Sequence, residues 1–269
     1  MISPEYRQAR TVLLDALDAL GPHRDAVVLV GAQAVYLHTG DADFATAPTT
    51  TDADLALLPG RLATEPSVVD AMLAAGFIPG RQPGSWLGTG GIAVDLMVPE
   101  GLCGQGGKRS ARLRPPHDDK NTARRTLGLE AAMVDNDVRV IPSLDEGDTR
   151  SFEIKVAGPA ALVVSKVVKI AERRDHPHRL KPKDGLDVLR LLRTVDVVRL
   201  SDSLKALASD ELSNIIVALA VKDLRVLATK PDDLLPQLAA DAERGFSDPD
   251  EIKYSMVALV GDLLHEFDR

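Results

Sequence analysis

Residues 50–59 read TTDADLALLP and carry two aspartates, Asp52 and Asp54, two positions apart. The run alternates in character and stops at Pro59, which predicts a strand over residues 52–58. Side chains two apart on a strand leave the same face, so the two carboxylates would lie side by side. They repel each other unless a cation lies between them, and magnesium, which prefers oxygen ligands, is the natural cation. Taken alone, the pair is more typical of a solvated edge strand, so the surrounding residues decide whether it indicates a cation site.

Apolar periodicity on both sides of this strand predicts alternating helices and strands. The helices repeat apolar residues three and four apart, and the buried strands are short runs rich in valine. Gly21-Pro22 ends the first helix, and Gly31 begins a tight passage from a strand into a helix. The predicted elements are a helix over 5–20, a strand over 26–30, a helix over 32–38, the strand over 52–58, a helix over 66–75, a strand over 92–98, and short strands over 138–141 and 152–156.

From Pro159 onward nearly all of the chain has helical periodicity. The sequence therefore predicts an α+β fold with two domains. A mixed sheet with flanking helices occupies residues 1–157 and a helical domain occupies residues 158–269, with the boundary near Gly158. Residues 99–120 are rich in Gly, Pro and Arg and too long for an ordinary connection. We expect them to form a mobile functional loop or a disordered segment.

Two further residues bear on the aspartate pair. Asp95 is the one charge inside the apolar run IAVDLMV (92–98), where an unpaired carboxylate is costly. It should therefore face a site, a partner or the end of the strand, and a salt bridge within the sheet would satisfy it equally well. Gly31, in LVGAQAVYLH (29–38), lets a backbone approach a phosphate, while the following helix offers free N–H groups.

A glycine turn, an Asp-x-Asp strand and a later strand with one Asp together match the arrangement in which carboxylates hold two metal ions for nucleotidyl transfer. On these residues the chain resembles the nucleotidyltransferase superfamily. Within it, the chain is similar to the AbiEii-type group, which includes MenT-like toxins of toxin–antitoxin systems. The resemblance covers most of residues 25–195. Its motifs are LVGAQA (29–34), TTDADL (50–55), AVDLMV (93–98), LVVSKVVKIAER (162–173) and KDGLDVLRLL (183–192).

The last two motifs carry charges at helical spacing. Lys166, Lys169 and Arg173 form a positive stripe suited to phosphates, and Asp184 and Asp187 lie three apart on the next helix. Periodicity alone favours an ordinary solvated face. The resemblance implies instead that Lys166 contacts the triphosphate, with Lys169 and Arg173 as further phosphate ligands. It also implies that Asp184, ahead of Asp187, orients Lys166 or engages the acceptor.

The resemblance implies a nucleotidyltransferase-like fold and a reaction between a nucleoside triphosphate and an acceptor hydroxyl. Two magnesium ions would be held by Asp52, Asp54 and Asp95, and Gly31 and Ala32 would bind the nucleotide. The toxin group implies the 3′ end of tRNA as acceptor and a cognate antitoxin as partner. A protein or small-molecule acceptor, or an inactive nucleotide-binding module of the same fold, remain the alternatives.

The chain departs from the family pattern at two places. The usual second Gly or Ser of the first motif is Ala32, which leaves only backbone donors for a phosphate. Many relatives place an Arg shortly before Asp-x-Asp. This chain has threonines there instead, at positions 46, 49, 50 and 51.

Composition limits where the protein can be located and which partners it can bind. The sequence has no run of about 18 apolar residues, so we predict no membrane span. The single cysteine, Cys103, fits a reducing cytoplasm. The net charge of −8 repels a polyanion, so RNA would need a local basic surface. Residues 108–125 hold seven Lys or Arg against two Asp and could form one. We expect His117, His176 and His178 at the surface and Trp86 in packing.

Overall fold

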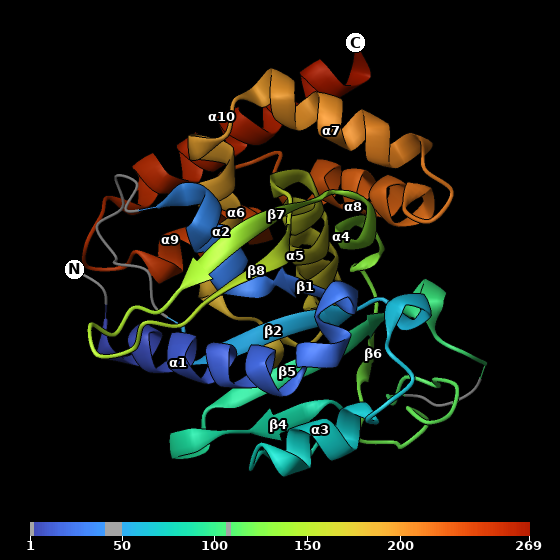
Figure 1. Ribbon diagram of the computed structural model, residues 1–269. Coiled ribbons are helices and arrows are strands. Elements are labelled where there is room, and N and C mark those ends of the chain that lie inside the picture. Colours follow the sequence, from blue (N-terminus) through green and yellow to red (C-terminus); the bar gives the residue numbers. More distant parts are fainter. Residues whose placement is uncertain (1–2, 41–49, 106–108) are drawn as a thin grey trace. The chain divides into compact units, whose positions relative to one another are not determined.

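The structure is a computed structural model that describes residues 3–40, 50–105 and 109–269 (Figure 1). Within these residues the chain divides into two compact units. Unit 1 contains residues 3–34, 50–105, 109–129 and 136–157, and unit 2 contains residues 35–40, 130–135 and 158–269. Thr46, Thr49 and Lys108, which entered the sequence argument, lie outside the described residues.

Unit 1 is built on a mixed sheet, which agrees with the predicted α+β class. Its described strands follow the order β3-β4-β5-β2-β1-β8-β7, and β6 pairs with β5. β1 runs antiparallel to β2 and parallel to β8, and β2 runs parallel to β5. The strands are β1 (Val27–Val30), β2 (Asp52–Leu57), β3 (Ile78–Pro79), β4 (Ser85–Leu87), β5 (Ala93–Pro99), β6 (Arg124–Thr126), β7 (Asn136–Pro142) and β8 (Ser151–Ala157).

The helix α1 (Pro4–Ala19) covers β2 and β5 on one face of this sheet (Figure 1). The Ser3 side chain accepts a hydrogen bond from the Tyr6 backbone N–H and caps its first turn. Leu13 and Leu17 are fully buried, and each such side chain contributes about 1.5–3 kcal/mol. The other helical elements of unit 1 are α3 (Val68–Ala74) and the 3-10 turns η1 (Gly21–Ala26), η2 (Pro59–Arg61), η3 (Thr89–Gly91) and η4 (Glu100–Leu102).

The described part of the segment after β5 is held by hydrogen bonds. The Ala111 N–H donates to the Ala123 carbonyl at 2.9 Å, and the Arg125 N–H donates to the Arg109 carbonyl at 2.8 Å. Ser110 and Arg124 also form an isolated bridge. Trp86, on β4, is fully buried, as predicted.

His117 corrects another expectation, because it is buried rather than at the surface. Its Nδ1 accepts a hydrogen bond from the Val68 N–H at 3.2 Å, so the neutral ring carries its hydrogen on Nε2, 2.8 Å from the Ala63 carbonyl oxygen. His23 meets the ring edge to face at 5.3 Å and is itself fully buried. His176 and His178 are exposed, as expected.

We expect unit 1 to lose stability as the pH falls below about 6.5. Burial, and then the neighbouring His117, lower the pKa of His23. Between the two pKa values, His23 is therefore protonated in the unfolded chain and neutral in the folded one. The stability from the neutral ring is fully present above the unfolded pKa and is lost as the pH falls, by up to about 1.4 kcal/mol per pH unit.

Urea unfolding between pH 5 and 8, with the variant His23→Phe beside the native chain, measures this effect. The variant should show a flatter pH profile over that range. Equal slopes for the two proteins would exclude His23 as the source.

Unit 2 is helical. α6 packs against α9, α5 against α8, and α10 against α7 and α9. A Cβ atom at Gly185 of α6 would lie 2.8 Å from the Ala239 backbone nitrogen, so this glycine allows α6 and α9 to approach closely. The helices are α2 (Gly31–Thr39, in unit 2 from residue 35), α4 (Glu130–Val134), α5 (Pro159–Arg173), η5 (Pro177–Arg179), α6 (Pro182–Thr194), α7 (Val197–Ser209), α8 (Asn214–Leu227), α9 (Leu234–Ala242) and α10 (Pro249–Asp268).

Asp135 joins α4 to the start of α5 within unit 2. Its Oδ2 accepts a hydrogen bond from the Ala161 N–H at 3.0 Å, and its carbonyl accepts one from the Gly158 N–H at 2.8 Å. The carboxylate thereby caps the N-terminus of α5, where the helix dipole favours negative charge. Among the helices that the structure describes, none has the length and apolarity needed to cross a membrane.

Candidate functional site

Three predicted metal ligands lie on one face of the sheet in unit 1. Asp54 of β2 is the register partner of Asp95 on β5, and Asp52 precedes Asp54 by two residues. Register partners point to the same side of a sheet, as do residues two apart. The pairing of β2 with β5 therefore places the three aspartates on one face of the sheet.

Gly31 leaves the space that Asp54 occupies. Its φ is 69°, a left-handed conformation, and a Cβ atom at this position would overlap the Asp54 carboxylate. Gly31 is the first residue of α2, so this carboxylate lies against the start of a helix. Ala32 follows it and is 4% exposed. The glycine predicted to approach a phosphate thus also contacts one of the predicted metal ligands.

One neighbouring residue and two distant ones hold the start of β2 in place. The Thr50 hydroxyl donates to Asp52 Oδ1 at 2.7 Å. The Gln33 amide donates to the Asp52 carbonyl at 3.2 Å and accepts a hydrogen bond from Arg10 Nε at 2.9 Å. Arg10 and Gln33 are almost fully buried. Sequence reasoning missed both, although Gln33 is a polar residue among apolar ones.

Asp95 has a protein partner. Arg124 Nη2 on β6 lies 2.9 Å from Asp95 Oδ2, and both side chains are mostly buried. Strand register explains the contact: Met97 is two residues from Asp95 on β5, and it is the register partner of Arg124 on β6. Of the alternatives predicted for Asp95, a site, a partner, a strand end or a salt bridge within the sheet, the structure shows the salt bridge.

The carboxylates on this face of the sheet differ in what they offer a magnesium ion. Asp52 and Asp54 supply the oxygen atoms that magnesium prefers. Asp95 is engaged by a guanidinium, which carries a permanent positive charge. Across the described ranges, no three His, Cys, Asp or Glu side chains converge as a metal-binding group. The residues that would hold an ion here are Asp52 and Asp54.

The predicted Lys–Asp constellation forms a buried ion cluster in unit 2. Lys166 Nζ on α5 lies 2.8 Å from Asp184 Oδ1 and 2.6 Å from Asp187 Oδ2, both on α6. Lys166 is 4% exposed, and each aspartate is 1% exposed. The structure thus joins Lys166 to both aspartates, whereas the resemblance implies Asp184 ahead of Asp187.

The cluster is electrostatically matched. Burial disfavours the charged ammonium, but Asp187 and Asp184 outweigh it and raise the pKa of Lys166. Burial likewise opposes ionisation of Asp184, but Lys166 and Lys169 outweigh it and hold the pKa of this carboxyl well below its usual range. Lys166 and Asp184 therefore each favour the charged form of the other, and the contact between them is one between ions.

Lys169 and Arg173, the other predicted phosphate ligands, also face Asp184. Lys169 Nζ lies 3.0 Å from Asp184 Oδ1, and Arg173 Nη1 lies 3.9 Å from Asp184 Oδ2. Their side chains are 34% and 23% exposed, against 5% for Lys166. The stripe that periodicity predicts therefore contains one buried cation, Lys166, and two partly exposed ones.

The basic segment after β5 also contains both ion-paired and exposed basic residues. Arg124 pairs with Asp95, and Arg125 pairs with Glu100 at 3.3 Å. The exposed basic residues of its described part are Arg109, Arg112, Arg114 and Lys120. These four remain available to an anionic partner.

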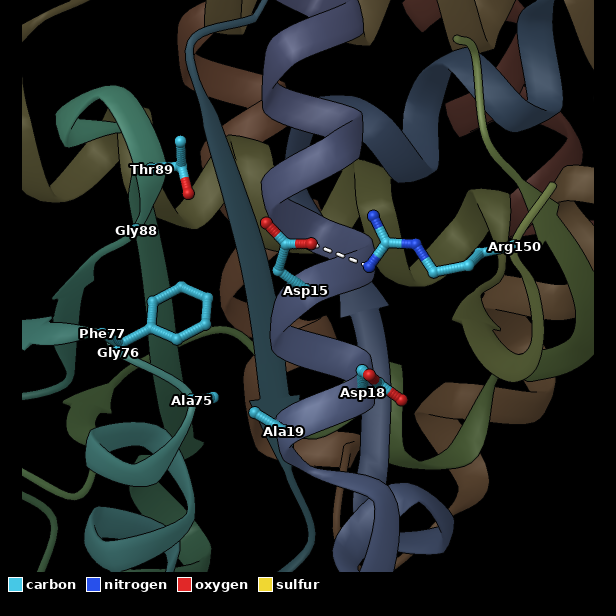
Figure 2. A pocket seen from close by; sticks show the side chains of 9 residues that line it. All are labelled: Asp15, Asp18, Ala19, Ala75, Gly76, Phe77, Gly88, Thr89 and Arg150. Carbon is cyan, nitrogen blue, oxygen red and sulfur yellow. Dashed lines mark hydrogen bonds and ion pairs between the residues drawn. The ribbon is translucent and has the colours of Figure 1, made fainter. Parts of the chain in front are cut away.

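A hollow of about 390 Å³ lies elsewhere in unit 1 (Figure 2). It is lined by α1, the turn after α3, the turn after β4 and the residue before β8. Arg150 donates there to Asp15 at 2.7 Å and also binds Asp148. None of the predicted site residues lines it.

Comparisons with models of protein families, with curated proteins and with solved structures found no match to the chain.

Proposed function

We propose that the chain is a metal-dependent nucleotidyltransferase with a nucleotidyltransferase-like fold. It transfers a nucleotide from a nucleoside triphosphate to an acceptor hydroxyl. The observation that carries the proposal is the alignment of Asp52, Asp54 and Asp95 on neighbouring strands, with Gly31 packed against Asp54. A carboxylate group at a glycine turn that opens a helix suits a divalent cation and a phosphate together.

The residues of this chain divide the chemistry between them. Asp52 and Asp54 would hold magnesium, which supplies charge to neutralise the triphosphate and favours proton loss from the attacking hydroxyl. Thr50 and Gln33 keep Asp52 in place through the hydrogen bonds described above. The start of α2 offers backbone N–H groups to a phosphate. In unit 2, the partly exposed Lys169 and Arg173 would bind phosphate oxygens in this proposal, and Asp184 and Asp187 hold the Lys166 ammonium.

The acceptor in this proposal is the 3′ end of tRNA, and the chain acts as the toxin of a toxin–antitoxin pair in the cytoplasm. The exposed Arg109, Arg112, Arg114 and Lys120 support an RNA acceptor, because a chain of net charge −8 needs such a local surface. Modification of the 3′ end would prevent aminoacylation and stop growth.

The test is incubation of the full chain with magnesium, total tRNA and each nucleoside triphosphate in turn, labelled at the α-phosphate. We expect label on tRNA, and a loss of about 100-fold or more in the Asp52→Ala, Asp54→Ala double variant. Asp137→Ala is the matched control, because Asp137 is an exposed aspartate on β7 of the same sheet. It should retain transfer.

Other outcomes separate the alternatives. Label in protein or in a small molecule, with RNA unlabelled, would replace tRNA by another acceptor. Triphosphate binding without transfer to any acceptor would overturn the enzyme proposal in favour of an inactive binding module.

A further inference from the structure

We propose that Arg124 takes the place of a second metal ion, so that the nucleotide-free protein holds one divalent cation on Asp52 and Asp54. The inference rests on the proposed function and narrows it, because the Asp-x-Asp and Asp pattern by itself predicts two ions. The geometry that carries it is the contact of Arg124 Nη2 with Asp95 Oδ2 at 2.9 Å.

Strand pairing, rather than the side chain alone, presents the guanidinium to Asp95. β6 pairs in parallel with the second half of β5, and Arg124 is the partner of Met97. Asp95 and Met97 are two apart and point the same way. The Arg124 side chain passes Met97 Sδ at 3.3 Å on its way to Asp95.

Gly84 fixes the Arg124 backbone from the other side. Its φ is 74°, and a Cβ atom here would overlap both the Arg124 backbone nitrogen and the Leu96 carbonyl oxygen. The Gly84 N–H donates to the Asn121 carbonyl, and the Gly84 carbonyl accepts from the Leu96 N–H at 2.7 Å. The arginine is therefore part of the packed sheet.

Charge matching leads to the same number of ions. The guanidinium of Arg124 already compensates the charge of the Asp95 carboxylate. A second cation beside Asp95 would have to displace the guanidinium or accept its repulsion. The side chains of Arg124 and Asp95 are 27% and 21% exposed, so solvent screens this repulsion less than on an open surface.

Manganese binding to the nucleotide-free chain, counted by electron paramagnetic resonance of the unbound ion, tests the inference. We expect one Mn²⁺ per native chain and two per Arg124→Met chain. Arg124→Lys should stay at one, because the positive charge is kept. Arg125→Met is the control: it removes the adjacent arginine, which pairs with Glu100, and should also stay at one.

Substitution of the aspartates gives a second readout that does not depend on the folding of Arg124→Met. Asp54→Asn should weaken Mn²⁺ binding by about 10-fold or more, as loss of an ion-holding group does. Asp95→Asn should leave Mn²⁺ affinity within about 3-fold of native, because Asp95 is not a ligand of the ion.

The two proposals fail in different ways. Two Mn²⁺ ions on the native chain, one on Arg124→Met, or an Asp95→Asn affinity as low as that of Asp54→Asn would overturn the role of Arg124 and leave the nucleotidyltransferase proposal standing. Absence of Asp54-dependent binding in all of these proteins would overturn the proposed function, and this inference with it.

Discussion

Replacement of Lys166 by methionine is expected to lower the free energy of unfolding by about 3–5 kcal/mol. Methionine keeps most of the length of the side chain but removes the ammonium that contacts Asp184 and Asp187 at 2.8 and 2.6 Å. Two carboxylates would then remain buried on α6 without their central cation. Urea unfolding followed by far-ultraviolet circular dichroism measures the loss, because unit 2 is helical.

Lys169→Met is the matched control for this prediction. Lys169 lies on the same helix and contacts the same aspartate at 3.0 Å, but its side chain is 34% exposed. Solvent screens that pair, so we expect a loss of at most about 1 kcal/mol. Equal losses in the two variants would show that burial of Lys166 does not set the energy of the cluster.

The second large effect is expected for Gly31→Ala. Alanine at a φ of 69° is strained, and its Cβ would overlap the Asp54 carboxylate. The strain costs about 1–3 kcal/mol, and the overlap forces Asp54 or the start of α2 to move. We therefore expect both lower stability and loss of the nucleotidyl transfer proposed above. Thermal unfolding and the labelled-triphosphate assay measure the two effects.

Gly90→Ala separates strain from overlap. Gly90 has the same φ of 69°, but no atom lies within 4 Å of its added Cβ. This variant should lose stability through strain and keep full transfer activity. If Gly31→Ala behaves in the same way, contact with Asp54 is not what requires glycine at position 31.

Much of the fold could be predicted from the sequence because its main elements have clear apolar periodicity. The helix predicted over 5–20 is confirmed as α1, and the strands predicted over 52–58 and 92–98 are confirmed as β2 and β5. The shared face of Asp52 and Asp54 follows from strand geometry. Their register with Asp95 required the pairing of β2 and β5, which spacing along the chain does not contain.

The remaining features depend on contacts between distant residues. Arg124 and Asp95 are 29 positions apart, and Arg10 and Gln33 are 23 apart. β3, β4 and β6 are two or three residues long, too short for a period-two pattern to register. Helical spacing showed that Lys166 and Lys169 share a stripe. It could not show that one is buried between two carboxylates and the other is accessible.

The two units alternate along the chain, which limits how recombination could exchange one unit without the other. The chain passes from one unit to the other five times. A fragment that starts at residue 158 lacks Asp135, which caps α5, and lacks Tyr36, whose ring lies 5.7 Å from the Arg190 guanidinium carbon in unit 2. Recombination that moved residues 158–269 alone would therefore not transfer the complete helical unit. A lineage that exchanged its sheet for another would have to keep two short pieces of the coding sequence in addition to the long segment that starts at residue 158.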